Sequence, residues 1–218
     1  MKRLLFLWIA LLVAPSFGSF YFDLTQGGAL RHLEAVQELP TSSGCHFEPD
    51  GRYVCESKPS SGTSEDREKD IGYIGGGPLL GVRLGASIKE AFAIFSNFEM
   101  EVTKGKNYGR NDDDESESNS GLIGWGFGVI LYPCFNSEGM MKNFYVGGTA
   151  NLLFGGGGGI GSVGEDVGLE CGYLFPVSGR TNVGFAAGAD IMSTSGLDGH
   201  IKDEGGYSVW IGLKIVRK

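Results

Sequence analysis

The feature that most constrains this chain is a strict alternation of side chains from about residue 79 to its last residues. Apolar residues occupy every second position, and polar or small residues lie between them. A β-strand with two different faces has this pattern, because successive side chains point to opposite sides. Seven segments show it: residues 80–88, 92–103, 123–133, 144–154, 167–175, 183–191 and 207–215. The sequence therefore predicts an all-β, antiparallel protein.

The composition of the second face favours a membrane barrel over a soluble sheet. This face has few of the Lys, Glu and Thr residues that cover a solvated sheet, and it is rich in glycine, of which the chain has 38. Small side chains suit the crowded interior of a narrow barrel. An apolar exterior around a polar, charge-paired interior is typical of outer-membrane barrels. We expect a lumen charge network formed by Arg83, Glu99, Glu101, Glu170, Asp190 and Lys214.

A soluble barrel of lipocalin type is the alternative to a membrane barrel. Its apolar face would line a ligand cavity and its glycine-rich face would meet water. Glycine-rich strands make a poor solvated exterior, so this alternative is the less favoured one. Aromatic residues near strand ends, such as Phe92, Tyr132 and Phe175, also indicate the interfacial girdles of a membrane barrel.

The first 18 residues are expected to be a cleaved signal peptide. Lys2 and Arg3 precede an apolar run over residues 4–14, and Ser16 and Gly18 suit the last positions before a cleavage site. The run is too short for a spanning helix, which needs about 20 residues. We therefore expect export, an irregular N-terminal segment over residues 19–70, and a barrel domain over residues 71–218.

Four cysteines fit an oxidising compartment. Cys45 and Cys55 flank residues 49–51, whose Pro-Asp-Gly sequence is a strong turn signal. A hairpin that closes on this turn sets the two cysteines opposite each other, which predicts a disulfide between them. Cys134 and Cys171 lie far apart in the strand order and are expected to be unpaired.

The strand count predicts one strand that the alternation does not mark. Outer-membrane barrels have an even number of strands, so seven visible strands imply an eighth, and it must precede residue 58. Residues 20–25 alternate but are few. Residues 28–39 carry apolar residues at helical spacing and predict a short helix, and residues 58–70 predict a polar loop. We therefore expect an up-and-down transmembrane β-barrel of eight strands.

The lengths of the connections indicate the orientation of the barrel. The short links are residues 87–90, 136–143 and 177–180, and the long ones are residues 104–120, 155–165 and 194–206. Outer-membrane barrels place short turns in the periplasm and long loops outside the cell. The last strand is therefore expected to run toward the periplasm.

Charge and motif content exclude several classes of function. A net charge of -8 with no basic block argues against a nucleic-acid partner. The cysteines show no C-x-x-C spacing, so we expect neither a metal nor a cofactor. The acidic run over residues 112–117 lacks the EF-hand order, and residues 155–161 lack the lysine of a phosphate-binding loop. No nucleophile accompanies His32, His46 or His200 at a motif spacing, so no catalytic residue is expected.

The chain resembles the small outer-membrane β-barrel superfamily, which includes OmpA-like transmembrane domains and opacity-type surface proteins. The similar features are the signal peptide, the glycine-rich opening strand over residues 75–82, and the alternating final strand over residues 207–215. The resemblance covers residues 71–218 and carries no functional residues. It implies an outer-membrane location.

The sequence thus favours a monomeric, non-enzymatic outer-membrane protein with a structural or interaction role. Its barrel would be an anchor in outer-membrane lipid, and its loops would contact an extracellular ligand or protein. A small porin-like channel and a soluble periplasmic ligand-binding barrel are the alternatives that remain open at this point.

Overall fold

The computed structural model describes residues 19–38, 43–47, 53–57, 68–88, 91–109, 116–136, 139–157, 160–196 and 201–218. Within these ranges, no helix is long and apolar enough to cross a membrane. The elements are β1 (Ser19–Glu38), β2 (Ser43–Phe47), β3 (Tyr53–Ser57), β4 (Glu68–Ile88), β5 (Phe92–Gly109), β6 (Ser116–Leu131), the 3-10 helix η3 (Met140–Asn143), β7 (Phe144–Gly157), β8 (Ile160–Ser178), β9 (Thr181–Gly196) and β10 (Ile201–Arg217).

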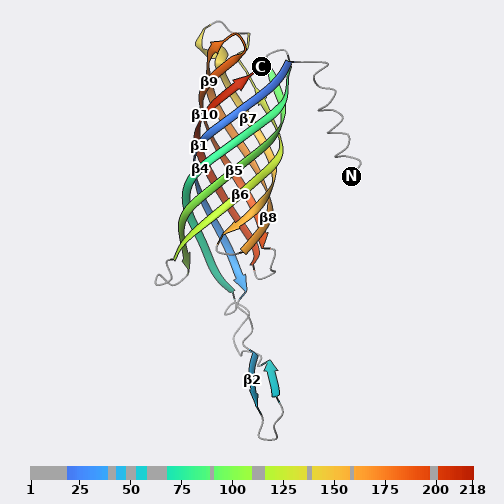
Figure 1. Cartoon of the computed structure of the whole chain (residues 1–218), viewed down its shortest axis with the longest axis vertical. Coiled ribbons are helices and arrows are strands. Elements are labelled where there is room, and N and C mark those ends of the chain that lie inside the picture. Colours follow the sequence, from blue (N-terminus) through green and yellow to red (C-terminus); the bar gives the residue numbers. More distant parts are fainter. Residues whose placement is uncertain are drawn as a thin grey trace, which may run out of the picture.

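Eight of the strands form a closed barrel in the order β1-β10-β9-β8-β7-β6-β5-β4 (Figure 1). Every neighbouring pair is antiparallel, and β1 closes the barrel by pairing with both β10 and β4. The predicted up-and-down barrel of eight strands is therefore confirmed. We call the end with the short links β4–β5, β6–β7 and β8–β9 the turn end, and the opposite end the loop end. The chain finishes at the turn end (Figure 1).

The eighth strand is β1, and it corrects two predictions. Residues 28–39 do not form a helix over their described part, because β1 continues as a strand to Glu38 between two partners that supply its hydrogen bonds. Leu33 points into the barrel and Leu30 points outward, as period-two alternation requires. The barrel domain therefore begins at Ser19 rather than at residue 71. The expected signal peptide over residues 1–18 lies outside the described residues.

The three connections predicted to be long loops are largely strand. The β5–β6 hairpin is strand up to Gly109 and again from Ser116, and the β7–β8 hairpin is strand up to Gly157 and again from Ile160. Both faces of these outer parts carry mostly polar and small residues, so no alternation in the sequence marks the continued strands there. The acidic residues 112–115 lie outside the described residues.

Most of the large apolar side chains that the structure describes face outward. Leu84, Phe98 and Phe185 are 47%, 46% and 58% exposed, so they do not line a cavity as a lipocalin-type barrel requires. On each barrel strand the outward apolar stretch covers 9 to 11 residues, close to the about 9–11 that a tilted strand needs to cross a bilayer. These stretches, here called the belt, are residues 20–30, 74–84, 92–102, 123–131, 144–154, 167–177, 183–191 and 207–215.

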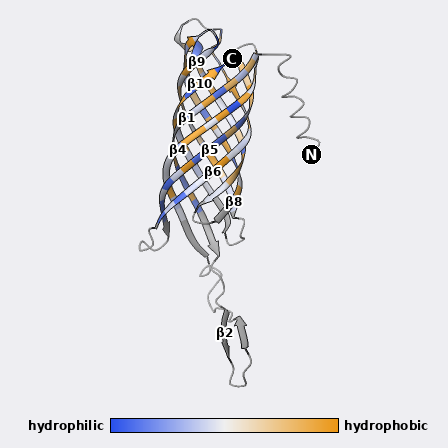
Figure 2. Ribbon diagram, in the orientation of Figure 1, coloured by the Kyte–Doolittle hydropathy of each residue, from blue (hydrophilic) through white to orange (hydrophobic). Residues whose placement is uncertain are grey.

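Beyond the belt, the loop end of the barrel continues as a polar extension. Its outward residues include Lys104, Lys106, Glu117, Glu165 and Ser195, all of which are exposed. Figure 2 shows hydrophobic and hydrophilic residues alternating along the barrel wall. The barrel thus has an apolar zone next to the turn end and a polar zone at the loop end.

The β2–β3 hairpin lies in the connection between β1 and β4. Its backbone register sets Cys45 opposite Cys55, as the turn signal predicted. The side chains of this hairpin lie outside the description, so the disulfide stays a prediction. Cys134 and Cys171 are free thiols.

Candidate functional site

Glycines on the inner face make room for the large side chains of the lumen. A Cβ atom on Gly188 would lie 2.5 Å from the indole Cε2 of Trp210, and one on Gly128 would lie 2.5 Å from the ring of Phe95. Gly147 gives similar room to Glu170, whose Cγ would be 3.1 Å away. Part of the glycine content of this face therefore has a packing cause: Gly128, Gly147 and Gly188 each lie beneath a larger side chain of a neighbouring strand.

Replacing Gly188 by alanine is expected to destabilise the barrel by about 1–3 kcal/mol, because the added methyl group displaces a rigid indole. The control is Gly148→Ala on the outer face, where the nearest atom to a new Cβ is 3.5 Å away. Urea unfolding of the folded barrel in detergent measures both. A double variant that adds Trp210→Leu should recover part of the loss. Equal stabilities for the two alanine variants would contradict the packing argument.

Four buried charged side chains meet in the lumen as a tetrad: Asp23 from β1, Arg83 from β4, Glu170 from β8 and Lys214 from β10. Glu170 Oε1 lies 2.6 Å from Arg83 Nη1 and 2.9 Å from Lys214 Nζ. Asp23 Oδ2 lies 2.8 Å from Lys214 Nζ and 3.5 Å from Arg83 Nη1. The two cations and two anions balance, and together they join four strands across the barrel.

Two further polar groups extend along the lumen. Asn97 accepts a hydrogen bond from Arg83 Nε at 3.0 Å and donates to Glu99 and Asn151, and Asn151 donates to Asp166. Separately, Arg31 on β1 pairs with Glu101 at 2.8 Å. The hydrogen bonds of Asn97 and Asn151 satisfy polar groups that would otherwise be costly to bury, whereas Arg31 Nε and Glu101 Oε1 are buried without a hydrogen-bond partner.

The six residues predicted to form one lumen network all lie on the inner face, but they fall into separate groups of contacting residues. Arg83, Glu170 and Lys214 meet in the tetrad. Glu101 pairs with Arg31 instead, and Glu99 receives its hydrogen bond from Asn97. The remaining residue, Asp190, lies beside Gly168.

Sequence reasoning missed Asp23 and Arg31, the two β1 members of these groups. Both alternate with outward residues along β1, at the same parity as Tyr21 and Thr25. Extending the short alternation of residues 20–25 onward by period two would have placed Arg31 inside. The leucines at helical spacing in residues 28–39 concealed this signal.

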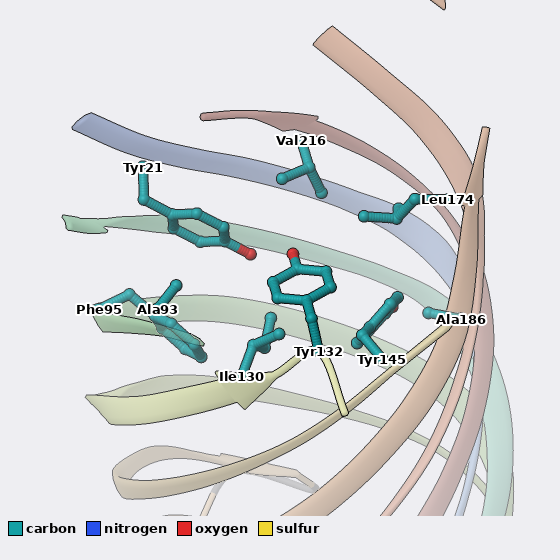
Figure 3. Close-up of a cluster of buried hydrophobic side chains, with 9 residues drawn as sticks. All are labelled: Tyr21, Ala93, Phe95, Ile130, Tyr132, Tyr145, Leu174, Ala186 and Val216. Atoms are coloured by element: carbon teal, nitrogen blue, oxygen red, sulfur yellow. The ribbon is translucent and has the colours of Figure 1, made fainter. Parts of the chain in front are cut away.

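Apolar layers lie on both sides of the polar lumen. The turn-end layer is drawn in Figure 3, where the hydroxyl ends of Tyr21 and Tyr132 point toward each other. Tyr132 is therefore a lumen residue and not the girdle aromatic that the sequence predicted. The turn-end layer contains Tyr21, Ala93, Phe95, Ile130, Tyr132, Tyr145, Leu174, Ala186 and Val216. The loop-end layer contains Leu33, Tyr73, Leu122, Leu153 and Met192.

The charged side chains of the lumen contact one another and aromatic rings. Lys214 Nζ lies 5.1 Å from the ring centroid of Tyr145, and the guanidinium of Arg83 lies 4.9 Å from that of Phe95. Within the described residues, no three His, Cys, Asp or Glu side chains are arranged to hold a metal ion. His32 lies on the outer face and stacks on Tyr207. This arrangement can hold strands together and fill the lumen.

Comparison with known proteins finds distant structural likenesses only. No protein-family model matches the chain, and no curated protein matches its sequence. Among solved structures, it is similar to the outer membrane protease OmpT from Escherichia coli, with 8% identity over 91% of this chain and 96% of that chain and a TM-score of 0.38. The attachment invasion locus protein Ail of Yersinia pestis has 9% identity over 91% and 99% of the two chains and a TM-score of 0.37. At such values nothing about activity or ligands follows.

Proposed function

We propose that this protein is a non-enzymatic barrel of a bacterial outer membrane. The barrel anchors the chain, and the polar extension and loops at its loop end contact an extracellular ligand or protein. One observation carries the proposal: all eight strands turn a belt of membrane-crossing length outward, and the charged residues within the belt point inward. A soluble barrel would expose this belt to water, where contiguous apolar patches of such extent are rare.

An anchor is favoured over a channel because the lumen is filled. An eight-stranded barrel has an interior just wide enough for side chains. Here the tetrad joins strands from across the lumen, and apolar layers lie toward both ends. An ion crossing the lumen would have to displace both layers and break the ion pairs.

Outer-membrane fractionation tests the anchor proposal. The protein should sediment with the outer membrane, and its unheated form should migrate differently on a denaturing gel from its heated form. A known periplasmic protein is the control for the fractionation. Recovery of the folded protein in the soluble periplasmic fraction would contradict the proposal.

Planar-bilayer recording separates an anchor from a channel. We expect no current above leak from the reconstituted barrel, with a known porin as the positive control. Stable conductance steps that require the folded protein would contradict the filled lumen and would favour the porin-like alternative.

A further inference from the structure

Charged residues are unevenly distributed between the two ends of the barrel. At the turn end, the charged residues that the structure describes are all cations: Lys142, Arg180, Arg217 and Lys218. The polar extension at the loop end carries both signs on its outer face, with the exposed Glu117 beside Lys104 and Lys106. Four described residues at the turn end thus have cationic side chains.

Three of these cations lie together where β8, β9 and β10 reach the turn end. The backbone N–H of Lys218 donates to the carbonyl of Arg180 at 3.1 Å, and Arg217 pairs in register with Thr181, the residue after Arg180. Both arginine side chains are exposed, and neither forms an ion pair with any described residue. Two guanidinium groups are thus available on one edge.

The outer surface next to these arginines is apolar and aromatic. Arg217 follows Ile215 in the outward row of β10, so its side chain continues the lipid-facing row of that strand. On the neighbouring strands, Phe175 contacts Tyr173 and Phe185, with ring centroids 4.8 Å and 6.4 Å apart. The site therefore combines an apolar surface, against which an acyl chain could pack, with a cationic edge at the turn end of that surface.

We propose that this edge of β8, β9 and β10 binds an anionic phospholipid. Its phosphate pairs with Arg180 and Arg217, and an acyl chain lies against the ring cluster of Tyr173, Phe175 and Phe185. Guanidinium groups match phosphate geometry through paired hydrogen bonds. The inference rests on the proposed membrane location, in which the turn end faces the periplasmic leaflet. The periplasmic leaflet would therefore have to contain an anionic phospholipid.

Native mass spectrometry of the detergent-purified barrel tests the proposal, with phosphatidylglycerol and phosphatidylcholine of equal chain length offered in competition. The test variant is Arg180→Gln/Arg217→Gln. The matched control, Lys104→Gln/Lys106→Gln, removes the same charge from the loop end. A second variant, Arg180→Lys/Arg217→Lys, keeps the charge and controls for folding. Each preparation is first checked for heat-dependent gel migration.

We expect the unmodified barrel to retain phosphatidylglycerol in preference to phosphatidylcholine. Each removed charge should lower this preference about fivefold, so the glutamine pair at the turn end should lose about 25-fold. The loop-end control should keep the preference, and the lysine pair should keep most of it. Equal retention of the two lipids, or equal losses in the two glutamine pairs, would overturn the proposal.

Competition with inorganic phosphate distinguishes a phospholipid-binding site from a site that binds any anion. Inorganic phosphate at millimolar concentration should leave the retained phosphatidylglycerol in place, because it cannot use the apolar surface. Displacement by inorganic phosphate would overturn the lipid assignment. A barrel with normal heat-dependent migration but no lipid preference would reject this site alone. Loss of outer-membrane fractionation would reject the proposed function itself.

Discussion

Replacing Glu170 by alanine is expected to destabilise the folded barrel by about 3–5 kcal/mol, the usual cost of breaking a buried ion pair. Glu170 Oε1 is shared by Arg83 and Lys214, and all three side chains are buried. Removing it leaves two buried cations facing the single carboxylate of Asp23. Because the tetrad joins four strands, the loss should appear as a lower urea midpoint for the whole barrel, measured by circular dichroism in detergent.

The matched control is Glu165→Ala on the same strand. Glu165 is exposed on the polar extension, and a surface carboxylate contributes only about 0–1 kcal/mol. Both variants remove a glutamate carboxylate from β8. The difference between their losses of stability therefore measures the effect of burial and ion pairing at Glu170. If Glu170→Ala were as stable as Glu165→Ala, the tetrad would not stabilise the barrel.

Replacing Ile211 by arginine is expected to cost about 2–4 kcal/mol in a lipid bilayer, the cost of placing a cation near the midplane of a membrane barrel. Ile211 is 67% exposed and occupies the middle of the outward row of β10. In a soluble barrel the same substitution on an exposed side chain would change stability by about 0.5 kcal/mol or less. Folding equilibria in vesicles, followed by gel migration across a urea series, measure the difference.

Ser195→Arg on β9 is the control for this substitution. Ser195 is exposed on the outer face of the polar extension, beyond the belt, so arginine there should be tolerated. A large loss for Ile211→Arg with little change for Ser195→Arg supports a bilayer around the belt. Similar small effects for both would indicate that the belt faces water.

Strands whose two faces differ in polarity could be predicted from the sequence. Strand segments whose two faces are similar in polarity could not. Within the belt, most outward residues are apolar and most inward residues are polar or small, so alternation marks seven strands. In β1 the outward positions Gln26, Gly28 and His32 interrupt the apolar row, which is why the strand was not recognised. In the polar extension the outward residues are mostly polar or small, and the inner face mixes apolar residues such as Leu33 and Leu122 with polar ones, so no regular contrast marks the continued strands.

Partners within one hairpin were predictable, whereas partners across the barrel were not. The expected proximity of Arg83 and Asn97 follows from the register of a single hairpin, and the two side chains are hydrogen-bonded. The contact of Arg83 with Glu170 joins residues 87 positions apart in the sequence. It depends on closure by β1 and on the tilt of all the strands, which one sequence does not reveal.

Spin labelling at Cys171 tests the central claim most directly. This native thiol is exposed on the outer face of β8 within the belt. It becomes the single cysteine after Cys45→Ser, Cys55→Ser and Cys134→Ser, and a matched protein carries Ser195→Cys in place of Cys171. In vesicles we predict that oxygen, which concentrates in lipid, relaxes the label at position 171 more strongly than a water-soluble nickel chelate does, with the reverse order at position 195. Stronger relaxation by the nickel chelate at both positions would contradict a membrane-spanning barrel.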